Sequence, residues 1–157
     1  MKKQIAIILL IAPILGYTQS KTTQQFHEEH ESAFVLFFYN NTLKMLNMED
    51  NAEFDELIKD IDKMKFIRVD KKDRGIDKNK FQQLVNQYHR EDFEDLMTMR
   101  QEGMNINVYI KEKKGITRGL VLLMDDDESL SILDIKGNVP LNKLANLVSQ
   151  VQGLEGF

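Results

Sequence analysis

The sequence predicts an α+β fold, in which helices pack mainly on one face of an antiparallel sheet. Strand-like segments follow one another through residues 93–136, with only turn-length gaps between them. Helical patterns gather before this region and after it. Because strand-rich and helix-rich runs are separated along the chain, one sheet with helices laid against it is the expected architecture.

Residues 1–18 have the layout of a secretory signal peptide. Lys2 and Lys3 precede an apolar core over residues 5–15, which is followed by Gly, Tyr and Thr. This core is shorter than the roughly 20 residues that a membrane-spanning helix needs. We therefore expect export, cleavage after Thr18, and a single soluble domain over residues 19–157 in the periplasm or cell envelope, with no transmembrane segment. An uncleaved anchor is the alternative.

The first part of this domain is predicted to change from polar coil to strand to helix. Residues 19–31 are polar and are expected to form a loose lead-in that tightens near Phe26. The apolar and aromatic residues 33–38 indicate a buried strand. A short helix that carries Leu43 and Leu46 is expected next, capped by Asn40. One continuous helix over both segments is the alternative.

Two amphipathic helices are predicted between residues 50 and 90. The first begins at residues 50–53, which resemble a capping box, and the second is capped by Asp77. The first carries apolar residues at helical spacing: Phe54, Leu57, Ile58, Ile61 and Met64. The second also carries residues at helical spacing on one face: Phe81, Leu84, Val85 and Tyr88. A brief strand over residues 66–69 and a charged turn over residues 70–75 separate them.

The region over residues 93–136 reads as an antiparallel meander. Apolar and polar residues alternate through residues 105–111, which predicts a strand whose dry face consists of Ile106, Val108 and Ile110. The unbroken apolar run over residues 120–124 is typical of a central strand, and residues 129–136 form the next one. Their short charged connections suit hairpins.

The dry face of the meander is expected to pack under the helices that carry Phe81, Leu84 and Leu144. The last of these helices is expected to have Pro140 in its first turn, where proline is favoured. Its apolar residues are Leu141, Leu144, Ala145 and Val148. Residues 153–157 are expected to form a loose tail.

Composition excludes several classes of site. The chain has no Cys, so it cannot form disulfides, a thiol nucleophile, a Cys-ligated metal site or a lipidated cysteine. Its 25 acidic and 21 basic residues leave a net charge of −4, which argues against nucleic acid as a partner.

Several segments carry a family resemblance. They are the signal peptide followed by Gln19, and residues 43–46, 93–97, 108–112 and 133–139. On these segments the chain resembles a group of uncharacterised exported proteins of Bacteroidota, the domain-of-unknown-function family 4252. The resemblance implies a periplasmic or outer-envelope protein of a Gram-negative bacterium. Relatives are often lipoproteins, and the absence of Cys departs from that subset. No catalytic residue is implied.

Two clusters invite a metal interpretation. His27 and His30 stand among glutamates, and His and carboxylate are ligands for zinc. They are three residues apart, however, whereas the zinc-protease helix motif needs a spacing of four. The acidic run over residues 125–128 lacks the ligand spacing of a calcium loop. A solvated lead-in and a solvated turn are therefore favoured, and no metal or cofactor is expected.

The leading functional hypothesis is a non-enzymatic binding or accessory module with an envelope protein or surface component as its partner. No hydrolase elbow, phosphate-binding glycine loop or dinucleotide fingerprint is present. The alternative is a small-molecule or lipid carrier with an apolar cavity between sheet and helices. Its candidate lining residues are Phe34, Phe37, Phe38, Met97 and Met99, for which core packing is the competing explanation. An enzyme with a site built from scattered residues ranks third.

Overall fold

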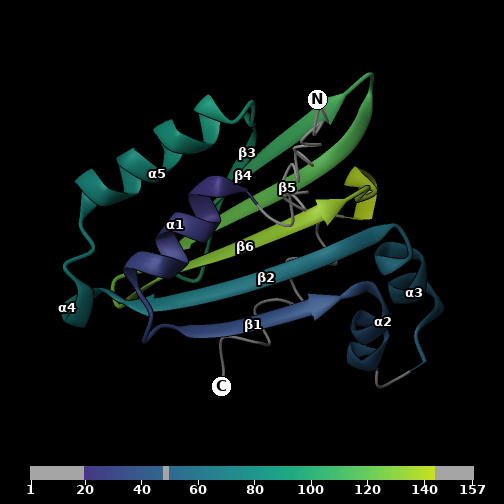
Figure 1. Cartoon of the computed structure of the whole chain (residues 1–157), viewed down its shortest axis with the longest axis horizontal. Coiled ribbons are helices and arrows are strands. Elements are labelled where there is room, and N and C mark those ends of the chain that lie inside the picture. Colours follow the sequence, from purple (N-terminus) through teal and green to yellow (C-terminus); the bar gives the residue numbers. More distant parts are fainter. Residues whose placement is uncertain (1–19, 48–49, 144–157) are drawn as a thin grey trace, which may run out of the picture.

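The computed structural model describes residues 20–47 and 50–143. Within them the chain forms one six-stranded antiparallel sheet (Figure 1). The strands are β1 (Phe34–Tyr39), β2 (Ile61–Asp70), β3 (Glu94–Gln101), β4 (Met104–Lys113), β5 (Ile116–Asp125) and β6 (Ser129–Gly137). Their order across the sheet is β1-β2-β6-β5-β4-β3. The last four strands form hairpins in succession, so the α+β class and the meander are confirmed.

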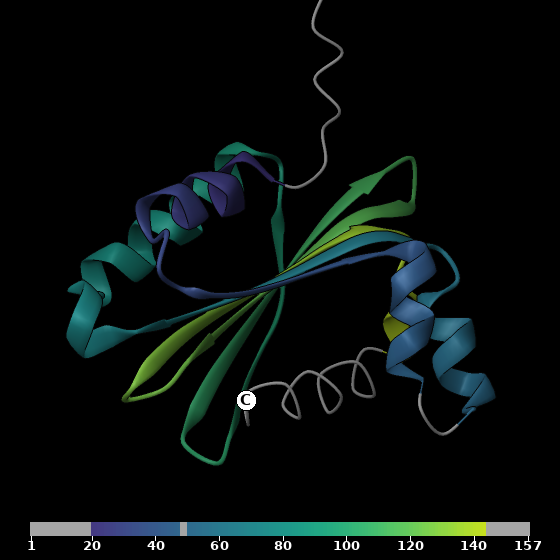
Figure 2. The same ribbon diagram turned by 60° about the horizontal axis from the view of Figure 1, so that its bottom comes forward.

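Helices cover both faces of this sheet (Figure 2). They are α1 (Lys21–Glu29), α2 (Asn40–Leu43), α3 (Ala52–Ile58), α4 (Lys71–Arg74) and α5 (Lys78–Arg90), with short 3-10 turns at Lys44–Leu46 and Leu141–Lys143. The two longest described helices, α1 and α5, share one face, as the expectation of mainly one-sided packing requires, while α2 and α3 lie on the other. None of the helices in the described ranges has the length and apolar character needed to cross a membrane.

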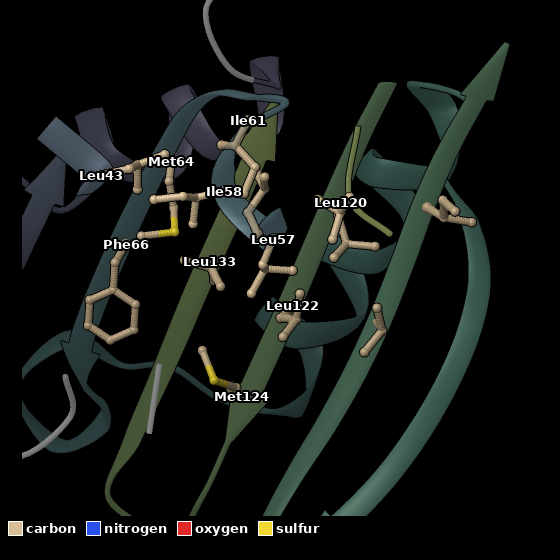
Figure 3. Close-up of a cluster of buried hydrophobic side chains, with 14 of the residues drawn as sticks. Leu43, Leu57, Ile58, Ile61, Met64, Phe66, Leu120, Leu122, Met124 and Leu133 are labelled. Carbon is tan, nitrogen blue, oxygen red and sulfur yellow. The ribbon is translucent and has the colours of Figure 1, made fainter. Parts of the chain in front are cut away.

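Each face has its own buried cluster, because successive residues of a strand point to opposite sides. Under α1 and α5, Phe26, Leu84 and Tyr88 pack with Val121 and Ile132. The second cluster, under α2 and α3, is shown in Figure 3 and includes Leu43, Leu57, Ile58, Phe66, Leu122 and Leu133. The sheet is therefore the central layer between two apolar layers.

The dry face predicted for β4 is correct. The helix that carries Phe81 and Leu84, however, does not pack against this face. Ile106 and Val108 are buried, in the cluster under α2 and α3. Phe81 and Leu84 belong to the opposite cluster, where they lie with Tyr109. Tyr109 is itself only 3% exposed, so β4 is covered on both faces at this residue. Leu141 begins the short 3-10 turn Leu141–Lys143, and Leu144 and the later residues of the predicted final helix lie outside the described residues.

The first predicted amphipathic helix ends earlier than its apolar spacing suggests. Helix α3 stops at Ile58, and Ile61 and Met64 belong to β2, which is longer than the strand expected over residues 66–69. Met64 pairs with Phe38 of β1 and with Ile135 of β6. Pairing on both sides satisfies the backbone of this segment, so the sheet overrides its helical pattern.

The local predictions over residues 33–47 and 77–90 agree better with the structure. A strand followed by a short helix is confirmed over residues 33–46, and the continuous helix is wrong. The strand is not buried as expected, because β1 is an edge of the sheet and its residues are exposed or half-buried. Asn40 is the first residue of α2 rather than its cap, and its side-chain amide donates to the Ile61 carbonyl oxygen at 2.8 Å. Asp77 caps α5 as expected, because its carboxylate accepts the Lys80 amide hydrogen at 2.8 Å.

The largest correction concerns the amino-terminal lead-in. The segment expected to be loose over residues 19–31 contains α1, and Phe26 of this helix is 1% exposed. The expected signal peptide over residues 1–18 and the expected tail over residues 153–157 fall outside the described residues.

Candidate functional site

Two carboxylates hold the first turn of α1. Asp134 Oδ2 on β6 accepts the Ser20 amide hydrogen at 3.1 Å and the Ser20 hydroxyl at 2.8 Å. Glu91, which follows α5, accepts the amide hydrogens of Lys21 at 2.8 Å and Thr22 at 2.7 Å, and the Thr22 hydroxyl at 2.5 Å. The first amide groups of a helix have no partner within the helix. These acceptors therefore explain why a polar segment is ordered here.

Beneath this turn lies a buried hydrogen-bond network. The Thr23 hydroxyl donates to Asp134, and it lies 2.8 Å from the Tyr88 hydroxyl. Because the Thr23 proton is directed to the carboxylate, the Tyr88 phenol acts as donor to Thr23. The Thr23 amide hydrogen is accepted by Ser20 Oγ at 3.0 Å. The network thus connects α1, α5 and β6.

Burial controls the titration of both acidic groups in the network. Burial raises the pKa of Asp134, and the hydrogen bonds from Thr23 and Ser20 oppose this shift. Burial also raises the pKa of Tyr88 well above its usual value, so the phenol keeps its proton. Tyr88 is 0% exposed and Asp134 is 2% exposed. Their geometry suits the positioning of α1 better than direct reaction with a substrate.

A pocket of about 430 Å³ opens beside the network, between the start of α1, the end of α5 and the adjoining ends of β4, β5 and β6. Its basic lining residues are Lys21, Arg90, Lys111, Arg118 and Lys136, and its acidic ones are Glu91, Asp92 and Asp134. Glu91 and Asp134 accept hydrogen bonds from α1. Five basic and three acidic side chains line the pocket, so basic residues are in excess here, in a chain whose net charge is −4.

The strand register forms the floor of this pocket. Lys111 of β4 lies opposite Gly119 of β5, which lies opposite Lys136 of β6. A Cβ atom at Gly119 would lie 3.4 Å from Cζ of Phe93, so the glycine lets this ring rest against the sheet. The Lys111 ammonium donates to the Glu91 carbonyl oxygen at 2.7 Å and lies 5.6 Å from the centroid of the Phe93 ring. A glycine and an aromatic ring thus lie between two ammonium-bearing side chains.

This arrangement can hold an anion. Arg90 and Arg118 are exposed side chains of the pocket wall, and guanidinium groups bind carboxylate and phosphate through paired hydrogen bonds. Lys63 of β2 lies opposite Lys136 and extends the row of basic residues across a fourth strand. Like charges on neighbouring strands are unfavourable unless a negative charge compensates them.

The proposed apolar cavity does not form from its candidate residues. Phe34, Phe37 and Phe38 lie on β1, and Met97 and Met99 lie on β3. These two strands are the opposite edges of the sheet, so the structure does not bring the two groups together. Two of the five residues, Phe38 and Met99, are partly buried and pack against the cluster under α2 and α3, as the competing explanation of core packing predicts.

The two histidines have separate partners. His27 Nδ1 lies 2.8 Å from the Lys65 ammonium, while His30 Nδ1 lies 2.8 Å from the Phe26 carbonyl oxygen. Burial and then the charge of Lys65 lower the pKa of His27, so a neutral imidazole accepts the Lys65 hydrogen bond. In the part of the chain that the structure describes, no group of three or more His, Cys, Asp or Glu side chains could hold a metal ion.

The acidic run over residues 125–128 forms a hairpin turn. Asp126 accepts the amide hydrogens of Glu128 at 2.8 Å and Ser129 at 2.6 Å, and Asp125 pairs with Lys71 at 2.7 Å. The carboxylates of Asp125 and Asp126 are thus directed to lysine and backbone partners.

Sequence reasoning did not single out Asp134 or the basic residues of the pocket. One signal was available: Asp134 is an acid flanked by Leu133 and Ile135 within a strand. A second was the order Ser20, Thr23, Phe26, in which a capping residue is followed by inward positions at helical spacing. The convergence of Lys111 and Lys136 has no comparable local signal, because it depends on strand register.

Comparison with known proteins identifies the family of the chain. A family model described as "Domain of unknown function (DUF4252)" matches residues 27–147. No curated protein and no solved structure matches the chain.

Proposed function

The chain belongs to the domain-of-unknown-function family DUF4252, and from this premise we propose that it is an exported binding module of the cell envelope. The matched region contains all six strands, and the family carries no activity that could be transferred to the chain. We place the binding site in the pocket between α1 and α5.

The proposal of export rests on the amino-terminal pattern of two lysines, an apolar core and a small-residue boundary. Amino-terminal sequencing of the protein isolated from its own cells is expected to begin near Gln19. Recovery of intact Met1 in a cytoplasmic fraction would contradict export.

The ligand is proposed to be a small organic anion with an apolar portion. The observation that carries this proposal is the pocket floor, where Lys111 and Lys136 flank Gly119 and the ring of Phe93. Charge-assisted hydrogen bonds favour a carboxylate or phosphate, and the ring offers an apolar contact. Binding rather than catalysis is favoured, because Asp134 and Glu91 already accept hydrogen bonds from α1.

The test is an NMR titration of the amide signals with benzoate, an aryl carboxylate. Saturable shifts are expected at Phe93 and Gly119, and the uncharged analogue benzyl alcohol should not produce them. Arg118→Gln should weaken benzoate binding about tenfold, the size expected for one charge-assisted hydrogen bond.

Arg100→Gln is the matched control. It makes the same charge change on β3, where Arg100 lies opposite Asn105 at the end of β4 remote from Lys111. Benzoate affinity should stay within about twofold of the parent protein. Equal losses in the two variants, or shifts spread over the whole surface without saturation, would refute the pocket as a binding site.

A further inference from the structure

The two edges of the sheet differ in chemistry. The outer strand β3 carries Glu94, Asp95 and Arg100, and its pairing with β4 is irregular between Asp95 and Met97. Charged side chains and bulges are the features by which natural sheets prevent pairing at an exposed edge. The other outer strand, β1, has the sequence FVLFFY, with no charge and no proline, and its pairing with β2 shows no irregularity.

The free edge of β1 is also apolar at its surface. Within residues 20–47 and 50–143, β1 pairs only with β2, so the backbone groups of its outer side have no strand partner there. Phe34 is 40% exposed, Phe37 37% and Tyr39 50%. A regular, uncharged edge with exposed aromatic residues is suited to the addition of another strand.

We propose that β1 pairs antiparallel with β1 of a second copy of this chain, so that one sheet continues through both protomers. A two-fold axis perpendicular to the sheet relates such strands and places the same face of both copies on the same side. Residues that lie opposite each other must then come from the same face of the strand.

Self-complementarity makes the second copy the preferred partner. Centring the axis on Leu36 places Leu36 opposite itself and Phe34 opposite Phe38. Centring it on Phe37 places Phe37 opposite itself and Leu36 opposite Phe38. Within β1, apolar or aromatic side chains lie opposite each other in either register, and Tyr39 lies opposite Val35 when the axis is on Phe37.

Charge does not oppose this pairing. The basic residues nearest to β1 in the sheet are Lys63, Lys65 and Arg68 of β2. The two β2 strands of the dimer would be separated by three strand spacings, about 14 Å. This exceeds the screening length of about 8 Å at physiological ionic strength.

Single cysteines test the geometry directly, because the chain contains no Cys. Leu36→Cys or Phe37→Cys, whichever residue lies on the axis, should form a covalent dimer when the dilute protein is oxidised with copper phenanthroline. Leu96→Cys is the control, since Leu96 on β3 is 36% exposed, close to the 37% of Phe37. It should remain uncrosslinked.

Sedimentation velocity provides an independent readout. The parent protein should be dimeric, and Phe37→Lys should raise the dimer dissociation constant at least about tenfold. Leu96→Lys should leave it unchanged. If Phe37→Lys does not fold, the cysteine variants decide. A parent protein that is monomeric at about 50 μM, equal cross-linking through Leu96→Cys, or a dimer broken by Leu96→Lys alone would overturn the proposal.

Discussion

At the scale of single residues, Asp134 joins the amino-terminal part of the fold to the sheet. It receives the Ser20 amide and the hydroxyls of Ser20 and Thr23, and Tyr88 completes the network through Thr23. A buried carboxylate is costly unless hydrogen bonds satisfy it. The same bonds that satisfy Asp134 therefore fix the start of α1 on the sheet.

His27 gives a prediction about pH. In the unfolded chain a histidine titrates near 6.5, whereas burial and the Lys65 charge lower the pKa of His27 in the folded state, opposed by Glu28 and Glu31. The unfolded state therefore takes up the proton at a higher pH than the folded state does. The free energy of unfolding consequently falls as the pH drops below about 6.5. His27→Gln removes this dependence.

The measurement is urea unfolding of the parent protein and His27→Gln at about pH 7.5 and about pH 5. The free energy of unfolding of the parent should fall relative to that of the variant as pH decreases, because all other titrating groups are shared. A difference between the two proteins that does not change with pH would show that His27 titrates alike in the folded and unfolded states.

At the scale of elements, α1 is held by its apolar side as well as by its caps. Phe26 is buried among Ile67, Leu84 and Val85, and its ring lies 4.3 Å from that of His30. Phe26→Ala should therefore lower the free energy of unfolding by about 3 kcal/mol through lost burial and a residual cavity. Urea unfolding, supported by hydrogen exchange of the α1 amides, measures this.

Gln25→Ala is the control within the same helix. Gln25 is exposed, and alanine is a good helix former, so its cost should stay within about 0.5 kcal/mol. Similar small effects at both positions would mean that α1 does not contribute to the core, as expected of a loose lead-in.

At the scale of the whole molecule, the two faces of the sheet differ in chemistry. The face under α2 and α3 carries an apolar cluster, whereas the face under α1 and α5 combines an apolar cluster with the buried network and the basic pocket. In the proposed dimer the axis is perpendicular to the sheet, so both pockets face the same side.

The sequence alone determined the features that depend on short-range pattern. Alternation identified the meander and the dry face of β4, helical spacing and the Asp77 cap identified α5, and the separation of these patterns indicated the α+β class. Each of these signals lies within a single segment, so no knowledge of its neighbours in space was needed.

Only the tertiary structure decided the features that join distant segments. Helix α1 is ordered because Ser20 meets Asp134, 114 residues later in the chain. Ile61 and Met64 leave a helical pattern because β6 pairs with both residues and β1 also pairs with Met64. Lys111 and Lys136 share a pocket floor through the register of β4, β5 and β6. Local propensity differs by only about 1 kcal/mol per residue or less, so such long-range contacts outweigh it.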